Sequence, residues 1–295
     1  MILNKFDKIG ILPNEKKDPL FEHTKNLIDY LSDINKIIRN INLYSDENYL
    51  EKLRNPIINY AAEEDLYKIC NLFIVLGGDG TILKAAAKAS LHNIPVIGIN
   101  LGRIGFMSEI ESDEINLLGN LFTGDYEITD RMMLNVEIIK DDGGNIYAGA
   151  GLNDAVVTNG TVAKLIEIDV ACNGVMITKY RADGVIVATP TGSTGYSMSA
   201  GGPIIDPNIE CFCVTPICPH SLVNRPLIFS RESVLEIINK NTNSDVYLTI
   251  DGRINIKLDR NDIVRIKKSN FTAKLISIKK HGFYDVVRAK ISEKF

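Results

Sequence analysis

The sequence lacks the long apolar run of a membrane protein. No stretch of its 295 residues approaches the roughly 20 apolar residues that a membrane-spanning helix needs. The first residues, MILNKFDKIGILPNEKKDP, place only short apolar groups between lysines, whereas a signal peptide has a continuous apolar core. We therefore expect a soluble, cytoplasmic protein without a membrane partner.

An excess of positive charge is also absent. Lys and Arg number 33 against 37 Asp and Glu, which gives a net charge of −4 and a pI near 5.7. This balance provides no general attraction to nucleic acids or anionic membranes, and we expect no nucleic-acid partner. The composition, 45% hydrophobic and 24% charged, is that of a globular protein of one large or two moderate domains.

Cysteine is scarce, with five residues in the chain, which excludes a secreted disulfide framework. Three of the five lie in CFCVTPICPH, residues 211–220, together with His220. Structural zinc sites usually separate paired cysteines by two to four residues, but one residue separates Cys211 from Cys213. Alternation along a strand would put both thiols on one face as small hydrophobic groups, so we predict packing and no metal site.

The first 110 residues alternate between helical and strand patterns. Ile9–Leu12 predicts a strand, and a helix is expected near residues 19–40 with Leu20, Leu27, Leu31 and Ile34 on one face. FIVL at 73–76 and PVIGIN at 95–100 predict two buried strands, joined by a helix from Thr81 onward. The order strand, helix, strand predicts a parallel sheet with right-handed connections.

Short strands dominate from about residue 126. NVEIIKDDGGNIYAGAG, residues 135–151, predicts a hairpin that turns at Asp-Asp-Gly-Gly-Asn. Further strands are expected at 155–158, 166–172, 185–188, 246–250, 263–267 and 273–278. We predict a Rossmann-like α/β domain over 1–125 and an all-β, sandwich-like domain over 126–279, with a C-terminal helix at about 280–295 that packs back on the first domain.

A glycine-rich turn, FIVLGGDGTILKAAAKAS, lies at residues 73–90. It is not a Walker A loop, because no lysine follows Gly80, and it lacks the third glycine of a dinucleotide fingerprint. Backbone amides at such a turn and the following helix N-terminus attract phosphate. Asp79 is either an ordinary helix cap or a base beside a phosphoryl group, and the second role explains a carboxylate at a phosphate-binding turn.

A second polar cluster is RADGVIVATPTGSTGYSMSAGGPI, residues 181–204. Its Ser, Thr and Gly residues are typical either of a flexible surface loop or of a loop that binds ribose, amide and phosphate groups. The flanking strand Val185–Ala188 and the GGPI segment favour a loop held in place. Asn153 and Asp154 precede another apolar run, where they either form a turn or bind the hydroxyls of a sugar.

These segments together resemble the NAD kinase family. The matching motifs are LGGDGT at 76–81, NLGRIGFM at 100–107, Asn153-Asp154, the 181–204 cluster, PICPHSLVNRPLIF at 216–229 and DVVRAK near the C-terminus. GGDG alone is shared with diacylglycerol and sphingosine kinases, but the ordered set is specific. The resemblance implies transfer of the γ-phosphoryl of ATP to the 2′-hydroxyl of the adenosine ribose of NAD, with Mg²⁺ accompanying ATP.

The resemblance also implies a set of site residues and a homodimer or homotetramer. Asp79 would accept the proton, and the active site would lie between the two domains. Phosphate would bind Gly77, Gly78, Gly80 and Thr81. The implied NAD-binding residues are Asp79, Gly80, Lys84, Phe106, Asn153, Asp154, Lys164, Arg181, Asp183, Thr191, Thr194, Gly195, Tyr196, Ser197, Met198, Ser199 and Arg253.

Two positions depart from the family pattern. Asp154 stands where glutamate is commoner, which shortens its reach by one methylene. Arg253, in DGR at 251–253, stands where many members have glutamine; it donates hydrogen bonds but cannot accept them, and contact with phosphate or with solvent are its two open roles. The sequence leaves open the phosphoryl donor and a preference between NAD and NADH. A lipid kinase and a non-catalytic dinucleotide sensor are the alternative functions.

Overall fold

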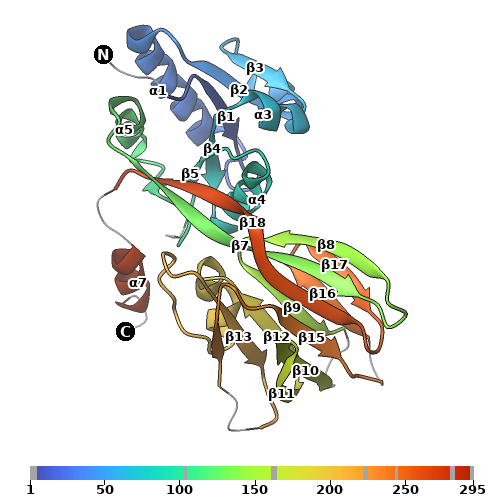
Figure 1. Cartoon of the computed structure of the whole chain (residues 1–295). Coiled ribbons are helices and arrows are strands. Elements are labelled where there is room, and N and C mark those ends of the chain that lie inside the picture. The colour runs from blue at the N-terminus through green and yellow to red at the C-terminus, as the bar shows by residue number, and fades with distance from the viewer. Residues whose placement is uncertain are drawn as a thin grey trace. The chain divides into compact units, whose positions relative to one another are not determined.

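The computed structural model describes residues 5–102, 105–160, 165–221, 225–242, 245–279 and 283–292. The chain forms two compact units, Met1–Asp130 with Ala273–Phe295, and Arg131–Thr272. Two long strands, β7 (Glu127–Ile139) and β18 (Ile263–Ser277), each run from one unit into the other (Figure 1).

A parallel sheet organises the first unit. Its strands lie in the order β5-β4-β1-β2-β3, and the end of β18 joins at β5 through Leu275 and Val96. The bounds are β1 (Lys8–Leu12), β2 (Asn42–Asp46), β3 (Ile58–Ala61), β4 (Leu72–Gly77), β5 (Val96–Asn100) and β6 (Ile110–Glu111). β1 pairs with both β2 and β4, so the C-terminal ends of β1 and β4 are neighbours.

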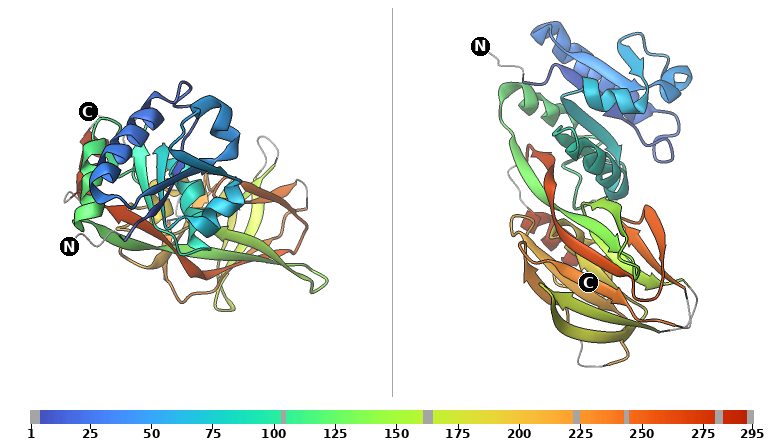
Figure 2. Two further views of the ribbon diagram at one scale, coloured as in Figure 1. Left: turned by 90° about the horizontal axis from the view of Figure 1, so that it is seen from above. Right: turned by 45° about the vertical axis from the view of Figure 1, so that its right-hand side comes forward.

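Helices cover both faces of this sheet (Figure 2). α1 (Glu22–Ile38) and α5 (Asn120–Thr123) lie on one face, and α3 (Glu63–Ile69) and α4 (Asp79–Ser90) lie on the other. The first unit also contains the short helix α2 (Leu50–Leu53) and the C-terminal helix α7 (Phe283–Ser292). Leu27 and Leu31 of α1 pack in one core with Ile74. On the other face, the rings of Tyr67 in α3 and Phe73 in β4 lie 4.7 Å apart between centroids. The chain builds the sheet from β1 to β3 on one side of β1, returns through α3 to β4 on the other side, and continues to β5. With right-handed connections, this reversal places helices on both faces.

The second unit contains two antiparallel layers. One has the order β14-β13-β12-β9-β16-β17, and the other contains β11-β10-β15-β18 with the β7–β8 hairpin. Their strands are β8 (Asn145–Gly151), β9 (Asp154–Asn159), β10 (Ile166–Cys172), β11 (Val175–Ala182), β12 (Gly184–Ala188), β13 (Cys211–Ile217), β14 (Leu227–Ser230), β15 (Leu235–Asn239), β16 (Val246–Ile250) and β17 (Ile254–Leu258). Both layers contribute to a single buried core.

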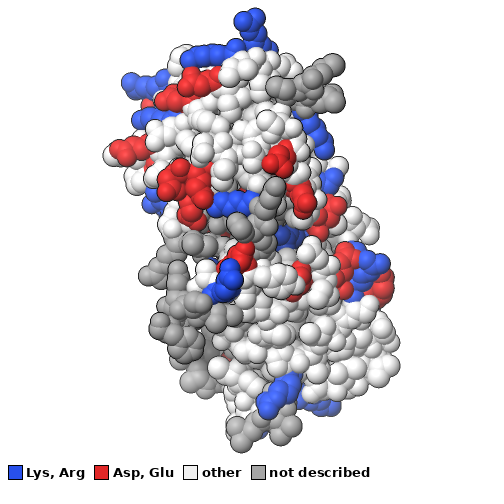
Figure 3. All heavy atoms as spheres, turned by 90° about the vertical axis from the view of Figure 1, so that its left-hand side faces the viewer, with Lys and Arg blue, Asp and Glu red and all other residues white. Residues whose placement is uncertain are grey.

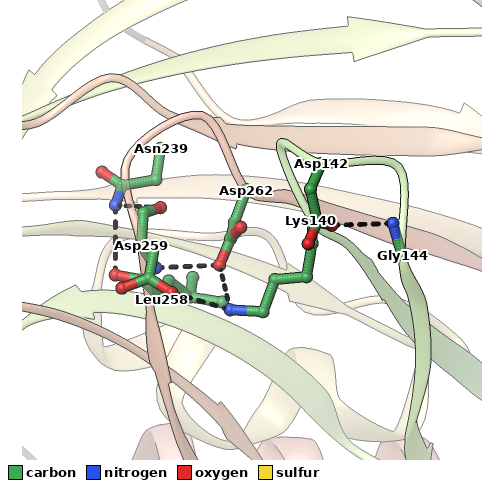
Figure 4. A network of polar contacts seen from close by, with 7 residues as sticks. All are labelled: Lys140, Asp142, Gly144, Asn239, Leu258, Asp259 and Asp262. Carbon is green, nitrogen blue, oxygen red and sulfur yellow. Dashed lines mark hydrogen bonds and ion pairs between the residues drawn. The ribbon is translucent and has the colours of Figure 1, made fainter.

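A buried carboxylate ties the β7–β8 hairpin to the turn before β18 (Figure 4). The Lys140 ammonium lies 2.7 Å from Asp262 Oδ2 and 3.0 Å from Asp259 Oδ2. The same Asp262 oxygen accepts the Asp259 N–H at 2.8 Å. Asn239 joins the cluster through its side-chain amide, which donates to the Asp259 carbonyl at 3.0 Å. Three strand ends are thereby held together by polar contacts.

Several sequence predictions are confirmed, among them the strands around residues 9–12, 73–76 and 95–100 and the hairpin at 135–151. Cys211 and Cys213 are buried in one apolar cluster, as predicted. No group of metal-binding side chains occurs among the described residues. None of the helices in the described ranges is both long and apolar enough to cross a membrane.

Three predicted boundaries are wrong. The helix after the glycine turn begins at Asp79 and not at Thr81. Leu20 lies before α1 and is 69% exposed, because the chain turns at Phe21 with a positive φ before the helix starts. The segments 263–267 and 273–278 belong to one strand, β18, since polar residues between them continue the ladder with one side facing solvent.

We predict that Lys140→Met lowers the free energy of unfolding by about 2 kcal/mol, because the buried Asp262 carboxylate loses its counter-charge. Urea denaturation measures the change. Lys257→Met is the matched control: Lys257 pairs with Asp245 at 2.8 Å, but both side chains are about half exposed, and no measurable loss is expected. Equal losses in the two variants would contradict a specific role for the buried carboxylate.

Candidate active site

The glycine turn presents Asp79 from the first position of α4. Gly78 is the N-cap of this helix and makes no side-chain capping bond. Asp79 Oδ2 accepts the Phe106 N–H at 2.8 Å, and Oδ1 accepts the Met107 N–H at 3.1 Å. The carboxylate is therefore not an ordinary cap of its own helix. It fixes the loop after β5 against the turn, and each oxygen keeps a lone pair for a further partner.

The glycines at and around this turn differ in the space available to a side chain. A Cβ on Gly77 would lie 2.7 Å from the Thr81 side chain, and one on Gly105 would collide with the Asp79 carboxylate, so these glycines permit close packing. A Cβ on Gly80 would meet no atom of the described residues within 4 Å. Open space thus adjoins the first turn of α4, whose N–H groups carry the positive end of the helix dipole.

Lys17 brings a positive charge to the same turn. A Cβ on Gly78 would lie 2.5 Å from Lys17 Nζ, and one on Gly102 would lie 3.5 Å from it. Lys17 follows β1, and Asn14 in the same loop donates to Thr81 Oγ1 at 2.6 Å. Lys17 is not among the site residues predicted from the sequence. The signal that could have identified it is its place after a strand whose end adjoins the end of β4 in the parallel sheet.

A cavity of about 160 Å³ lies within the first unit, beside the glycine turn. Thr81 belongs to both the turn and the cavity wall. The lining residues come from the ends of β1 and β2, from β4, and from the helical segments that follow β2, β3 and β4: Leu12, Pro13, Asp46, Tyr49, Glu63, Tyr67, Val75, Thr81, Lys84 and Ala85. The walls thus combine two aromatic rings, apolar groups, two carboxylates and one ammonium. Such a wall suits a flat ring system that carries hydrogen-bond donors.

Phe106 is partly buried and faces the C-terminal helix. Its ring centroid lies 6.4 Å from that of Phe283, and Lys290 Nζ lies 4.5 Å from the same ring. Both partners belong to α7, so this helix packs against the loop that Asp79 fixes. The ring–ammonium distance is within the range of a cation–π interaction.

In the second unit, the Asp251 carboxylate holds the segment before β9. It accepts the N–H of Leu152 at 2.9 Å on Oδ2, and those of Asn153 and Asp154 at 2.8 and 3.1 Å on Oδ1. Arg253 Nη2 donates to Asp251 Oδ2 at 3.0 Å. The guanidinium is therefore directed at a buried carboxylate, a contact that neither of the two roles considered from the sequence includes.

Asp154 is a buried carboxyl group of this segment, and Asn153 beside it is partly buried. Burial first, and then the negative charge of Asp251, raise the pKa of Asp154 to about 7. Asn153 Oδ1 is buried and has no hydrogen-bond partner among the residues that the structure describes. A buried acceptor left unpaired costs free energy, so a ligand donor at Asn153 would stabilise the site.

The chain matches two family models, described as the ATP-NAD kinase N-terminal domain over residues 9–126 and the ATP-NAD kinase C-terminal domain over residues 152–278. The chain belongs to the NAD kinase family. It is 38% identical to an NAD kinase of Caldanaerobacter subterraneus subsp. tengcongensis over 97% of this chain and 99% of that protein. It is 39% identical to an NAD kinase of Geobacter sulfurreducens over 77% of this chain and 80% of the relative.

Solved NAD kinase structures share the fold. Yeast NADH kinase complexed with NADH has 26% identity and a TM-score of 0.87, with coverage of 97% of this chain and 87% of that one. An NAD kinase from Archaeoglobus fulgidus in complex with ATP has 25% identity and a TM-score of 0.69, with coverage of 97% and 98%. The predicted family and the division into an N-terminal α/β part and a C-terminal β-rich part are thus confirmed.

The hydroxyl-rich loop of this NAD kinase family member is built on short helices, η3 (Thr191–Thr194) and α6 (Tyr196–Ser199). Ser193 Oγ donates to the Pro190 carbonyl at 2.6 Å and accepts the Ile205 N–H at 3.0 Å, so the loop is not a flexible one. Ser197 is fully buried and bonds Thr215 through its hydroxyl. Tyr196 and Met198 are exposed at 47% and 37%.

The remaining predicted residues fall into three groups. Arg181 and Asp183 are exposed at the end of β11 and just after it. Lys84 is exposed on α4 and lines the cavity of the first unit. Lys164 lies outside the described residues.

The carboxylate at the glycine turn can be compared with the oxygen ligands that the expected Mg²⁺ prefers. Mg²⁺ prefers oxygen ligands and commonly binds one or two carboxylates plus substrate phosphates. Asp79 is the carboxylate of the glycine turn, and both of its oxygens already accept amides. The residues therefore fit a cation held mainly by the phosphates of a nucleotide.

On the face drawn in Figure 3, acidic and basic side chains are interspersed and neither sign forms a continuous patch.

We predict that Lys17→Ala weakens phosphate binding at the glycine turn and raises the KM for ATP about tenfold, the effect of losing one charge-assisted hydrogen bond. Steady-state kinetics at saturating NAD measures it. Lys16→Ala removes the neighbouring exposed lysine and serves as the control, with a KM within about twofold of the unsubstituted protein. If both variants behave alike, Lys17 acts only through general surface charge.

Proposed function

We propose that this protein transfers the γ-phosphoryl group of ATP to the 2′-hydroxyl of the adenosine ribose of NAD, which yields NADP and ADP. The observation that most directly supports this reaction is the Asp79 carboxylate, fixed by two amides beside the open space at Gly80 and the ammonium of Lys17. Phosphoryl transfer needs a base, groups that bind phosphate, and a cation. Asp79, the N-terminal amides of α4 and Lys17 provide them at this turn.

In this mechanism the Asp79 carboxylate accepts the proton of the 2′-hydroxyl as that oxygen attacks the γ-phosphorus. The bond from the γ-phosphorus to the bridging oxygen breaks, and ADP leaves with the electron pair. Lys17 and the N-terminal amides of α4 offset the charge on the phosphoryl oxygens. Mg²⁺, bound with ATP, would supply further neutralisation of the phosphate charge.

We further propose that the cavity in the first unit binds the nucleoside of the donor. Asp46 and Glu63 line it, and Glu63 is paired with Lys88 at 2.8 Å. We place the triphosphate outside the cavity, toward Thr81 and the glycine turn, where the helix N-terminus and Lys17 provide positive charge. The carboxylates accept hydrogen bonds from ribose hydroxyls or an exocyclic amine, and Tyr49 and Tyr67 provide aromatic contact. This assignment favours a nucleoside triphosphate over polyphosphate, and it moves Lys84 from the NAD-binding set to the donor.

We propose that the residues implied by the family resemblance contact NAD, each through the group that it exposes or leaves unpaired. Asn153 offers a buried, unpaired acceptor, and Asp154 a carboxylate for ribose hydroxyls. Exposed Tyr196 offers an aromatic face. The other proposed contacts are Gly80, Phe106, Lys164, Arg181, Asp183, Thr191, Thr194, Gly195, Ser197, Met198 and Ser199, and the proposed phosphate contacts are Gly77, Gly78, Gly80 and Thr81. Arg253, also implied by the resemblance, pairs with Asp251, so its proposed part in NAD binding is indirect.

We also propose a fold type for each of the two domains. The five-stranded parallel order with helices on both faces supports a Rossmann-like N-terminal domain, and the core shared by two antiparallel layers supports a sandwich-like C-terminal domain. The domain limits at 125 and 279, a cytoplasmic location and a homodimer or homotetramer remain predictions from the sequence.

We predict that Asp79→Asn lowers kcat by a factor of about 100 or more while NAD binding is largely kept, because the amide cannot accept the proton. NADP formation from NAD, ATP and Mg²⁺ is followed with a coupled NADP-specific dehydrogenase. A near-normal rate in the variant would remove Asp79 from the role of base. A folded, unsubstituted protein that binds NAD but forms no NADP would instead favour the sensor function.

We predict that Ala85→Leu fills the cavity and raises the KM for ATP about tenfold or more, with little change in the KM for NAD. Ala85 is 5% exposed and lines the cavity, whereas Ala87, on the same helix, does not line it. Ala87→Leu is therefore the control. An unchanged KM for ATP in a folded Ala85→Leu protein would exclude the cavity as the nucleoside site.

A further inference from the structure

The turn between β16 and β17 places the Asp251 carboxylate in the interior of the second unit. Asp251 and Gly252 have φ values of +49° and +65°, and Arg253 N donates to the Ile250 carbonyl at 2.9 Å. Positive φ at both central residues is typical of a type I′ hairpin turn. The turn directs the Asp251 side chain inward, where it is fully buried, while the Arg253 side chain remains 33% exposed.

Asp251 is the centre of a relay of hydrogen bonds. Its carboxylate holds the N–H groups of residues 152–154, as described above. The carbonyls of that segment bind Thr189: Thr189 Oγ1 donates to Leu152 O at 2.6 Å, and Thr189 N donates to Asn153 O at 2.8 Å. Thr189 Oγ1 in turn accepts the Gly192 N–H at 3.1 Å. One carboxylate thus sets the backbone of both Asn153-Asp154 and the start of the hydroxyl-rich loop.

Packing at the far end of this relay allows little adjustment. A Cβ on Gly192 would collide with the backbone of Asn153, and one on Gly195 would lie 3.5 Å from Asn153 Nδ2. The loop therefore rests directly on the residue whose amide the Asp251 carboxylate holds. A small displacement of Asn153 must move the loop as well.

Hydrogen bonds stabilise a buried carboxylate, and a counter-charge stabilises it further. Three amides supply the hydrogen bonds to Asp251, and the guanidinium of Arg253 supplies the charge. The counter-charge matters here because Asp154 places a second buried carboxyl group close enough to interact electrostatically with Asp251. A neutral residue at position 253 would leave two buried acidic groups without a cation from this turn.

We propose that Arg253 is a positioning residue for nucleotide binding: its guanidinium holds Asp251 on the amides of residues 152–154 and so orients Asn153, Asp154 and the hydroxyl-rich loop. The inference rests on the proposed function only for the identity of the nucleotide, NAD. It differs from direct contact between Arg253 and phosphate, because it predicts effects on the amides of residues 152–154 with no nucleotide present.

Protonation provides a distinctive readout. Asp154 interacts electrostatically with Asp251 and with Tyr196 of α6. Tyr196 also interacts electrostatically with Asp183 and Cys218. Arg253 forms an ion pair with Asp251. A ribose diol presents two donors, and an ionised carboxylate accepts both through charge-assisted hydrogen bonds, whereas a protonated carboxyl group is a weaker acceptor and uses one oxygen as a donor. NAD binding should therefore strengthen as the pH rises through about 7, the pKa of Asp154. Loss of the Arg253 cation disfavours the ionised form and moves this dependence to higher pH.

The experiment compares Arg253→Gln, Arg253→Lys and the unsubstituted chain by calorimetric titration with NAD between pH 6 and 8.5. At pH 7 we expect Arg253→Gln to bind NAD about tenfold more weakly, with its pH dependence displaced upward, and Arg253→Lys to recover most of the affinity. Arg265→Gln is the matched control: Arg265 pairs with Glu236 at 2.9 Å and is 37% exposed, but lies outside the relay. It should leave the NAD affinity and its pH dependence unchanged.

Hydrogen exchange of the Leu152, Asn153 and Asp154 amides, measured without nucleotide, provides the second readout, and Arg253→Gln should accelerate it. Should Arg253→Gln fail to fold, the exchange of these amides in Arg253→Lys, expected close to that of the unsubstituted chain, decides in its place. Unchanged exchange together with an unshifted pH dependence in Arg253→Gln would overturn the positioning role, even where NAD still binds. If the unsubstituted chain binds no NAD, the proposed function fails; faster exchange in Arg253→Gln would still support the relay.

Discussion

Backbone amides bound to aspartate carboxylates hold the candidate site residues of each unit. Asp79 accepts two amides from the loop after β5, and Asp251 accepts three from the segment before β9. Hydrogen bonds to a charged group contribute about 1.5–3 kcal/mol each, more than neutral ones. Both carboxylates join segments that are remote in sequence, so the surrounding loops have little freedom to move apart from them. Preorganised loops of this kind are what positioning of a phosphoryl group demands.

The glycine turn combines close packing at two glycines with free space at a third. Gly77 and Gly105 permit Thr81 and Asp79 to pack tightly, whereas Gly80 borders empty space. Lys17 then contributes a cation from a neighbouring strand end, so the turn does not depend on a lysine of its own as a Walker A loop does. A carboxylate at a phosphate-binding turn would repel phosphate. Here the amides of residues 106 and 107 bind the Asp79 carboxylate, and Lys17 in the loop after β1 supplies positive charge for the phosphate.

Much of the α/β unit follows from sequence patterns, because β4 and β5 are continuous apolar runs and α4 is rich in alanine. β2, with the sequence NLYSD, has too few apolar residues to be recognised, and only its pairing with β1 explains it. The glycine turn and Asn153-Asp154 were identifiable from composition and from the family resemblance. Lys17 and the Asp251 contacts were not, since partners about 60 to 100 residues apart meet only through the strand order.

Asp154 shows why the site is not optimised for stability alone. Its pKa is raised to about 7, so the folded state binds more protons than the unfolded state between the ordinary aspartate pKa and about 7. The stability contributed by this group therefore falls as the pH rises through that range and stays low above it. A buried carboxyl that destabilises the ionised fold persists where a ligand uses it. Donors on a sugar would favour the ionised form, and binding below about pH 7 would then release a proton.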